Sequence, residues 1–287
     1  MELTIMDDHA RIANMFTHMS SGFACVIDFT AIISHAIPIT LDIVRPINKT
    51  RGENVHITSE YFVDHSKYYL VAVIHLTICV CVGAISMAST GVMFMNCGIH
   101  ACALFKVANY RMGIVMDQTV LQMSSPEREH VIHERIIHAV NFHRTAMQFC
   151  QILLMYLEKW FSILVVIGVL STSITLFRFL NAITYHANDA VELFISAACV
   201  FGHFLSLFFG NHIGQQVTDN NSEIFDTAYN LPWYVASSNI KHLFLLLLQR
   251  GNKKFYLSLS SLFTASYEGF ATLTTSSISY FTVLYSV

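Results

Sequence analysis

Long runs of apolar residues dominate the chain and determine the architecture that it predicts. A helix needs roughly 20 apolar residues to cross the hydrocarbon core of a bilayer. Five segments meet this requirement, at about 13–39, 68–105, 160–177, 193–217 and 259–287. The pattern therefore predicts an all-α, polytopic transmembrane helical protein with about five spans. A shorter apolar run at 242–249 is too brief to cross a bilayer and predicts a buried or interfacial helix.

Composition supports this fold class. Hydrophobic residues make up 54% of the 287 residues, charged residues make up 12%, and the mean hydropathy is +0.52. Soluble domains have about 25% charged residues, so the sequence is typical of a membrane protein in contact with lipid. The net charge of −3 offers no basic surface, which argues against a nucleic acid partner.

The distribution of lysine and arginine predicts the orientation. Eleven of the 16 lie in the N-terminal segment and in two loops at 106–159 and 219–256. Cytoplasmic loops carry this excess, so five spans place the N-terminus in the cytoplasm and the C-terminus outside. A glycosylation acceptor, Asn48 in "NKT", falls in a loop predicted to be external. Rhodopsin-type G-protein-coupled receptors have the opposite orientation.

The last predicted span carries a stripe of hydroxyls. At about 100° per residue they share one helical face, with Val283 and Val287 at its edge. The hydroxyls of this stripe belong to Thr272, Thr275, Ser279, Thr282 and Ser286. Hydroxyls gain nothing from lipid, so the stripe should face protein or water. It is either a close helix contact, which the residues alone favour, or the wall of an aqueous pore with an apolar gate.

The sequence contains no motif that indicates an enzyme. The histidine-rich stretch His130–His143 lacks the HExxH order, and its spacing does not stack four metal ligands on one helical face. We interpret it as an exposed polar helix. Motifs for binding dinucleotides or phosphate and for a nucleophilic serine are also lacking. The sequence therefore predicts no enzyme, no metal and no cofactor.

The last third of the chain resembles the insect odorant receptors. The stretch from "NNSEIFDTAYNLPWYVASSNIKHL" through "QRGNKKFYLSLSSLFTASYEGF" to "SYFTVLYSV" follows the C-terminal signature of that family. Two upstream segments also resemble the family: "HACALFKVANYRM" is similar to the cytoplasmic end of its fourth helix, and "HRTAMQFCQILLMYLEKWF" to the entry into its fifth. One departure is Lys254, which stands where family members usually have proline after Lys253.

The resemblance implies a function. Family members have seven spans, and this chain corresponds to helices three to seven, without the first two. They are ligand-gated cation channels of four subunits in the plasma membrane of olfactory sensory neurons. The resemblance thus implies an odorant-specific subunit that detects a volatile odorant and forms a hetero-tetramer with a shared co-receptor. Alternatives are a G-protein-linked or gustatory-type chemoreceptor, or a truncated non-functional copy.

The resemblance also implies a domain organisation. Residues 1–217 would form the ligand-binding transmembrane helices, with a cytoplasmic helical extension near 106–159. Residues 219–256 would form a cytoplasmic anchor between subunits, and residues 257–287 the pore-lining helix. The pore and gate positions correspond to Ser279, Val283 and Val287.

Further site residues follow from the same resemblance. The anchor would include Tyr229, Trp233, Tyr234, Lys241 and Arg250, with Trp233, Tyr234 and the "LFLLLL" run in its core. A mostly apolar odorant pocket in the outer half of the membrane would be lined by Phe29, Ile33, Val73, Thr77, Phe201 and Phe204. Asp28 is costly within a span and is a functional candidate in its own right. His18 or His75 could supply its charge partner.

Overall fold

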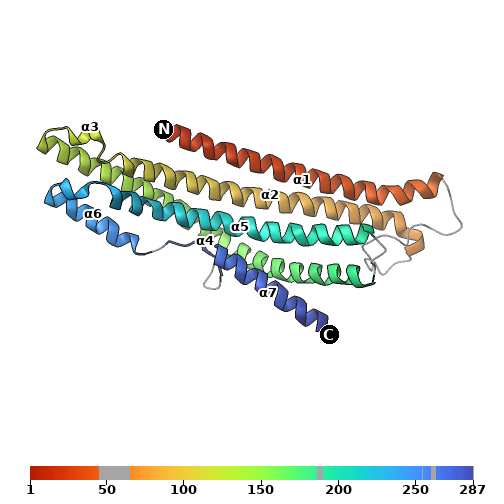
Figure 1. The fold of residues 1–287 in the computed structure, drawn as a ribbon. Helices are drawn as coiled ribbons and strands as arrows, with labels where there is room; N and C mark the ends of the chain where they lie inside the picture. Colours follow the sequence, from red (N-terminus) through yellow and green to blue (C-terminus); the bar gives the residue numbers. More distant parts are fainter. Residues whose placement is uncertain (45–64, 186–189, 254, 260–262, 287) are drawn as a thin grey trace. The chain divides into compact units, whose positions relative to one another are not determined.

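The computed structural model describes residues 1–44, 65–185, 190–253, 255–259 and 263–286. Its elements, in order, are α1 (Glu2–Val44), α2 (His65–Gly113), α3 (Gln118–Leu121), α4 (Ser125–Tyr185), α5 (Ala190–Asn230), η2 (Trp233–Val235), α6 (Ser238–Gly251), β1 (Ser258–Leu259), β2 (Phe263–Thr264) and α7 (Tyr267–Ser286). The strands β1 and β2 pair antiparallel, with Ser258 opposite Thr264. The all-α prediction is confirmed, and helices cover most of each predicted apolar span (Figure 1).

The described residues form two compact units. The smaller unit is Arg11–Asn96, and the larger comprises Met1–Ala10 together with Cys97–Val287. By length and composition, three of the described helices could cross a membrane, namely α2, α4 and α5. The first and last predicted spans correspond to α1 and α7, and their crossing of the membrane stays a prediction.

Helices α4 and α5 organise the larger unit. They pack along each other, α7 contacts both, and α6 contacts the end of α5 (Figure 1). Each of α4 and α5 runs without interruption through a segment that the sequence analysis assigned to the cytoplasm. In particular, α5 continues past residue 217, where we predicted the transmembrane part to end. These helices therefore connect a polar bundle to the predicted membrane region without a hinge in either backbone.

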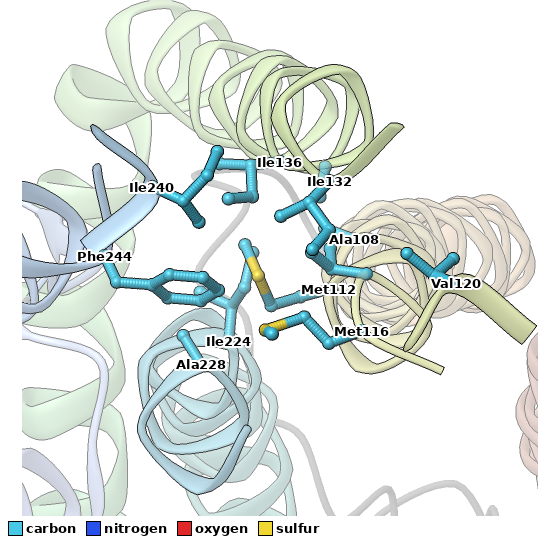
Figure 2. Packing of buried hydrophobic residues seen from close by; sticks show 12 residues of the cluster. Ala108, Met112, Met116, Val120, Ile132, Ile136, Ile224, Ala228, Ile240 and Phe244 are labelled. Atoms are coloured by element: carbon cyan, nitrogen blue, oxygen red, sulfur yellow. The ribbon is translucent and has the colours of Figure 1, made fainter. Parts of the chain in front are cut away.

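Five helical segments at the polar end of the larger unit pack around an apolar core. We name this part of the unit the α2–α6 bundle. It is built from the end of α2, α3, the first half of α4, the end of α5 and α6. Its buried residues converge from these helices in Figure 2, and they are Ala108, Met112, Val115, Met116, Val120, Ile132, Ile136, Ala139, Ile224, Ala228, Ile240 and Phe244. The segments 106–159 and 219–256 thus share one core. Burial of this apolar area stabilises the bundle.

Amphipathic patterning explains which faces of these helices are buried. In α6 the "LFLLLL" run divides, because Phe244 is buried, whereas Leu245 and Leu246 point outward. A helix turns about 100° per residue, so consecutive leucines cannot all face one core. In the histidine-rich stretch, His130, His133 and His138 are exposed, as the prediction of a polar helix requires.

His143 differs from that prediction, because it is buried in the bundle. Its Nε2 donates to the backbone oxygen of Asn221 at 3.2 Å, and its ring lies 5.4 Å from Phe105 and 5.7 Å from Phe225 between centroids. The sequence reading missed this because it weighed the stretch as metal ligands or solvated surface. Burial lowers the pKa of His143, the hydrogen bond to Asn221 opposes that change, and nearby Arg250 adds to it.

The N-terminal turn of the chain belongs to the same unit. Arg111 donates through Nε and one terminal nitrogen to both carboxylate oxygens of Glu2, each at 2.8 Å. Its guanidinium carbon also lies 4.3 Å from the centroid of the Phe142 ring. The Arg111 guanidinium lowers the pKa of Glu2 through this hydrogen bond, while burial opposes the change. This bidentate geometry fixes the start of α1 against α2 and α4.

The start of α7 is attached to α5 by close packing and hydrogen bonds. Asn211 of α5 accepts from the backbone N–H of Ser266 at 3.2 Å, and the Ser266 hydroxyl caps α7 by accepting from the N–H of Gly269 at 3.0 Å. The Nδ1 of His212 and the hydroxyl of Tyr267 are 2.8 Å apart. These contacts satisfy backbone groups that a helix start otherwise leaves unpaired.

Two glycines permit this approach. A Cβ added at Gly214 of α5 would overlap the side chain and backbone of Ala265, and one added at Gly269 would overlap the backbone oxygen of Thr264. Further along, the Ser173 hydroxyl of α4 lies 2.9 Å from the backbone oxygen of Ser277. We name the contacts of Asn211, His212 and Gly214 with residues 265–269 the α5–α7 junction.

Replacement of Gly214 tests the junction. Gly214→Val should displace the turn before α7 and lower stability by about 1–3 kcal/mol, the usual cost of overpacking. Gly210→Val on the same helix is the matched control, because a Cβ there meets nothing within 4 Å. Thermal denaturation midpoints of the purified chain in detergent measure the difference. Equal midpoints for the two variants would contradict the close approach.

Acidification tests the buried state of His143. Because its pKa is lowered in the folded protein, the unfolded chain binds a proton first as pH falls below about 6.5. Stability attributable to His143 is therefore present above that pH and is lost as pH falls. We expect the denaturation midpoint to fall between pH 7.5 and 5.5, and His143→Gln to reduce this dependence. An unchanged pH dependence in the variant would show that His143 is solvated.

Candidate functional site

The candidate site is the terminal helix α7, which has a packed side and an open side. Gly269, Leu273 and Ser277 recur every four residues, are buried, and form the side that packs within the larger unit. Ser277 is fully buried, and the Ser173 hydroxyl bridges its backbone oxygen and that of Val169. This seam uses small residues at regular spacing, as helix contacts in membranes commonly do.

The hydroxyl stripe lies on a different side from that seam. All five members are exposed: Thr272, Thr275, Ser279, Thr282 and Ser286. The Ser279 hydroxyl donates to the backbone oxygen of Thr275 at 2.9 Å, and the Thr282 hydroxyl to that of Ser279 at 2.7 Å. Each proton is thereby satisfied within α7, and the oxygen can still accept a bond from outside. The residues alone favoured a close helix contact for this stripe. Within this chain the stripe makes no such contact.

The open end of α7 exposes large apolar residues as well as hydroxyls. Val283 lies at the edge of the stripe and is 60% exposed, while Tyr285 is 65% exposed. The two are separated by about 200° around the helix, so they face nearly opposite directions. Val287, the second predicted gate residue, lies outside the described residues. The roles of Ser279, Val283 and Val287 stay predictions.

The predicted anchor residues fall at the edge of the α2–α6 bundle. Trp233 packs against its core, and its indole N–H donates to the backbone oxygen of Tyr229 at 3.2 Å. Their place in an anchor core between subunits stays a prediction, and in the single chain Tyr229 and Tyr234 are exposed. The 3-10 turn Trp233–Val235 explains this, because neighbouring side chains there point in different directions.

The charged anchor residues are also at the surface. Arg250 is exposed and donates to the backbone oxygen of Lys253 at 3.0 Å, which closes the end of α6. Lys241 is half-buried in the first turn of α6. Lys254, the departure from the family pattern, lies outside the described residues. These positions, with Tyr229 and Tyr234, remain candidates for contact with another subunit.

The predicted pocket residues of α1 and α2 belong to the smaller unit. Val73 is buried, and the Thr77 hydroxyl donates to the Val73 backbone oxygen at 2.8 Å. Phe29 and Ile33 of α1 are exposed. On α2, Val73 is therefore buried and Thr77 half-buried, whereas the pair on α1 faces outward.

The predicted pocket residues of α5 belong to the larger unit. Phe201 is exposed, and Phe204 is half-buried. Between them in sequence, the Nε2 of His203 lies 3.2 Å from the Ser171 hydroxyl of α4. The six predicted residues are thus shared between two units, and a common pocket stays a prediction. The glycosylation acceptor Asn48 lies outside the described residues.

Sequence reasoning missed the residues that position α7. Asn211, Gly214 and Ser173 were not singled out, because each is an ordinary small or polar residue inside an apolar span. A signal for the seam was present in the spacing of Gly269 and Ser277, two turns apart on the terminal helix. Its partners on α4 and α5 are far away in sequence, so the pairing could not be inferred. Among the described residues there is no cluster of metal-ligating side chains.

Comparisons with known proteins agree with this architecture. The chain is similar to the insect olfactory receptor OR5 from Machilis hrabei, solved in complex with eugenol. The TM-score is 0.72 at 13% identity, and the match covers 99% of this chain and 69% of that one. A second structure of that receptor gives a TM-score of 0.68 at 14% identity, covering 98% and 68%. At these identities the likeness shows the fold.

A comparison with curated proteins gave no match. A sequence model of the 7tm odorant receptor family, by contrast, matches residues 2–278. This match extends over nearly the whole chain and includes both units. It agrees with the C-terminal signature and with membrane-spanning helices of a multi-pass protein. The chain therefore belongs to the 7tm odorant receptor family.

Proposed function

We propose that this chain is an odorant-specific subunit of a ligand-gated cation channel in the plasma membrane of olfactory sensory neurons. It assembles with a shared co-receptor into a hetero-tetramer, and α7 of each subunit lines the common pore. One observation carries the proposal: α7 packs through one side, while its hydroxyl stripe remains open. Membership of the odorant receptor family supports the receptor function.

The geometry of α7 suits a pore wall. The Ser279 and Thr282 hydroxyls already donate to α7 itself, so their oxygens are available to accept from water and to solvate a passing cation. Val283 then adds an apolar constriction near the outer end of the same face, where dewetting can block conduction. Copies of this helix around an axis would cover surfaces that the single chain leaves open.

The α5–α7 junction supplies a mechanical path for gating. Asn211 and Gly214 lie on the same continuous helix as Ile224 and Ala228, which belong to the core of the α2–α6 bundle. A ligand that binds the open arrangement more tightly shifts the population toward it. Displacement of α5 would then move the start of α7, while the unpacked far end of α7 separates from its neighbours at Val283.

Cysteine substitution tests the pore wall. Ser279→Cys and Val283→Cys, and Val287→Cys at the predicted second gate position, should react with a charged thiol reagent from the external bath and change the odorant-evoked current. The assay uses the chain expressed with the co-receptor. It should work in excised patches without nucleotide, because a channel needs no G protein.

Matched variants distinguish a pore from general exposure. Tyr285 is as exposed as Val283 in the single chain but points in nearly the opposite direction, outside the stripe, so Tyr285→Cys should contact lipid and stay unreactive. Leu273→Cys lies in the packed seam and should also stay unreactive. The pore assignment fails if cysteines at 279, 283 and 287 are inert in a conducting complex. It also fails if positions 283 and 285 react equally.

A further inference from the structure

The smaller unit contains a carboxylate that the chain leaves without a cation. Asp28 lies in the apolar part of α1, where a charge is costly. Its Oδ1 is excluded from solvent and has no hydrogen-bond partner. Four other side-chain oxygens of the described residues are also buried without a hydrogen-bond partner. They belong to Asn96, Asn109, Asn221 and Thr274. Those groups are neutral, so Asp28 is the one ionisable group among them.

The surroundings of Asp28 offer weak compensation. The Cys81 thiol of α2 lies close enough to its side chain to interact with it, and a thiol is a weak donor. Within the described residues, Asp28 takes part in no ion pair, so the expected partnership with His18 or His75 is not formed. Asp28 as a whole is half-buried, and a carboxylate whose inner oxygen has neither a cation nor a donor is costly within an apolar span. The site is therefore incomplete in the chain as it stands.

The carboxylate faces a surface that suits a small organic ligand. Cys81, Thr77 and Val73 recur every four residues, so they share the face of α2 that Cys81 directs toward Asp28. On α1, Ala24 lies one turn before Asp28 and is buried, as is Val73. The Thr77 proton is already donated to the Val73 backbone oxygen. The face thus combines small apolar groups, acceptor oxygens and one negative charge.

We infer that Asp28 is the recognition point for a ligand that carries a protonated amine. An alkylammonium supplies the positive charge and up to three N–H donors that this site lacks, while its hydrocarbon body replaces lipid or water against the apolar face. A neutral alcohol of the same shape supplies one donor and no charge. The inference rests on the proposed function, since it names the chemical class of odorant that this subunit detects.

Direct binding to the purified full chain tests the inference. The probes are primary amines with butyl to octyl, benzyl and phenylethyl bodies, each paired with the alcohol of the same shape. At neutral pH at least one amine should raise the denaturation midpoint in detergent more than its alcohol does. Asp28→Asn keeps the shape and removes the charge, so it should weaken binding of that amine about tenfold or more and leave the alcohol unaffected.

Control variants separate charge recognition from loss of fold. Asp7→Asn makes the same change at an exposed position of α1 and should leave amine binding unchanged. Asp28→Glu retains the charge and should restore part of the preference for amines. Without ligand, Asp28→Asn should denature at no lower temperature than the natural chain, because it removes a charge whose inner oxygen has no partner. A lower midpoint would mean that Asp28 is satisfied within the protein, which overturns the inference.

The binding and current measurements fail independently. If no amine binds better than its alcohol, or if Asp28→Asn binds amines as the natural chain does, the amine site is wrong. That result would hold even if alcohols open the complex with the co-receptor, in which case the proposed channel function stands. If amines bind and Asp28→Asn abolishes the preference but no odorant evokes current, the site stands and the channel function fails.

Discussion

The attachment of α7 to α5 is the constraint on which the rest of the structure depends. Asn211 and the Ser266 hydroxyl complete the start of α7, and Gly214 lets α5 approach it closely. Because the packed side of α7 is set by Gly269 and Ser277, the position of the hydroxyl stripe is also set. A bulkier residue at either glycine would reorient every side chain beyond the junction.

Because α5 is long, it connects the α5–α7 junction to the core of the α2–α6 bundle. The same helix carries Gly214 at the junction and Ile224 in the bundle core, which are ten residues or about 15 Å apart. A continuous helix transmits displacement with little loss, unlike a flexible linker. His143 braces this stretch by donating to the backbone oxygen of Asn221 between aromatic rings. In the proposed channel, the bundle would be the fixed base relative to which α7 moves.

The pattern of apolar residues along the chain predicted the helices well. It predicted the contacts between the helices poorly. Apolar runs indicate a helix regardless of partners, so the all-α class could be read from the sequence. The polar segment before Trp160 was predicted to be helical, but its continuity with the apolar span after Trp160 was not, because the two segments differ in polarity. The burial of His143 was missed because its partners lie far away in sequence. The α5–α7 junction depends on pairings of that kind.

A polar group in an apolar helix has a structural role when the chain itself satisfies it. Ser173 bridges two backbone oxygens and Asn211 caps a neighbouring segment, so both explain the fold and require no ligand. Asp28 is different, because its buried oxygen lacks a donor and its charge lacks a counter-ion. The hydroxyl stripe of α7 is intermediate, since the protons of Thr272, Ser279, Thr282 and Ser286 are used within the helix and their oxygens are open. A polar group whose hydrogen bonds are all made within the chain stabilises the fold. A polar group that still lacks a donor, an acceptor or a counter-ion is a candidate for contact with another molecule.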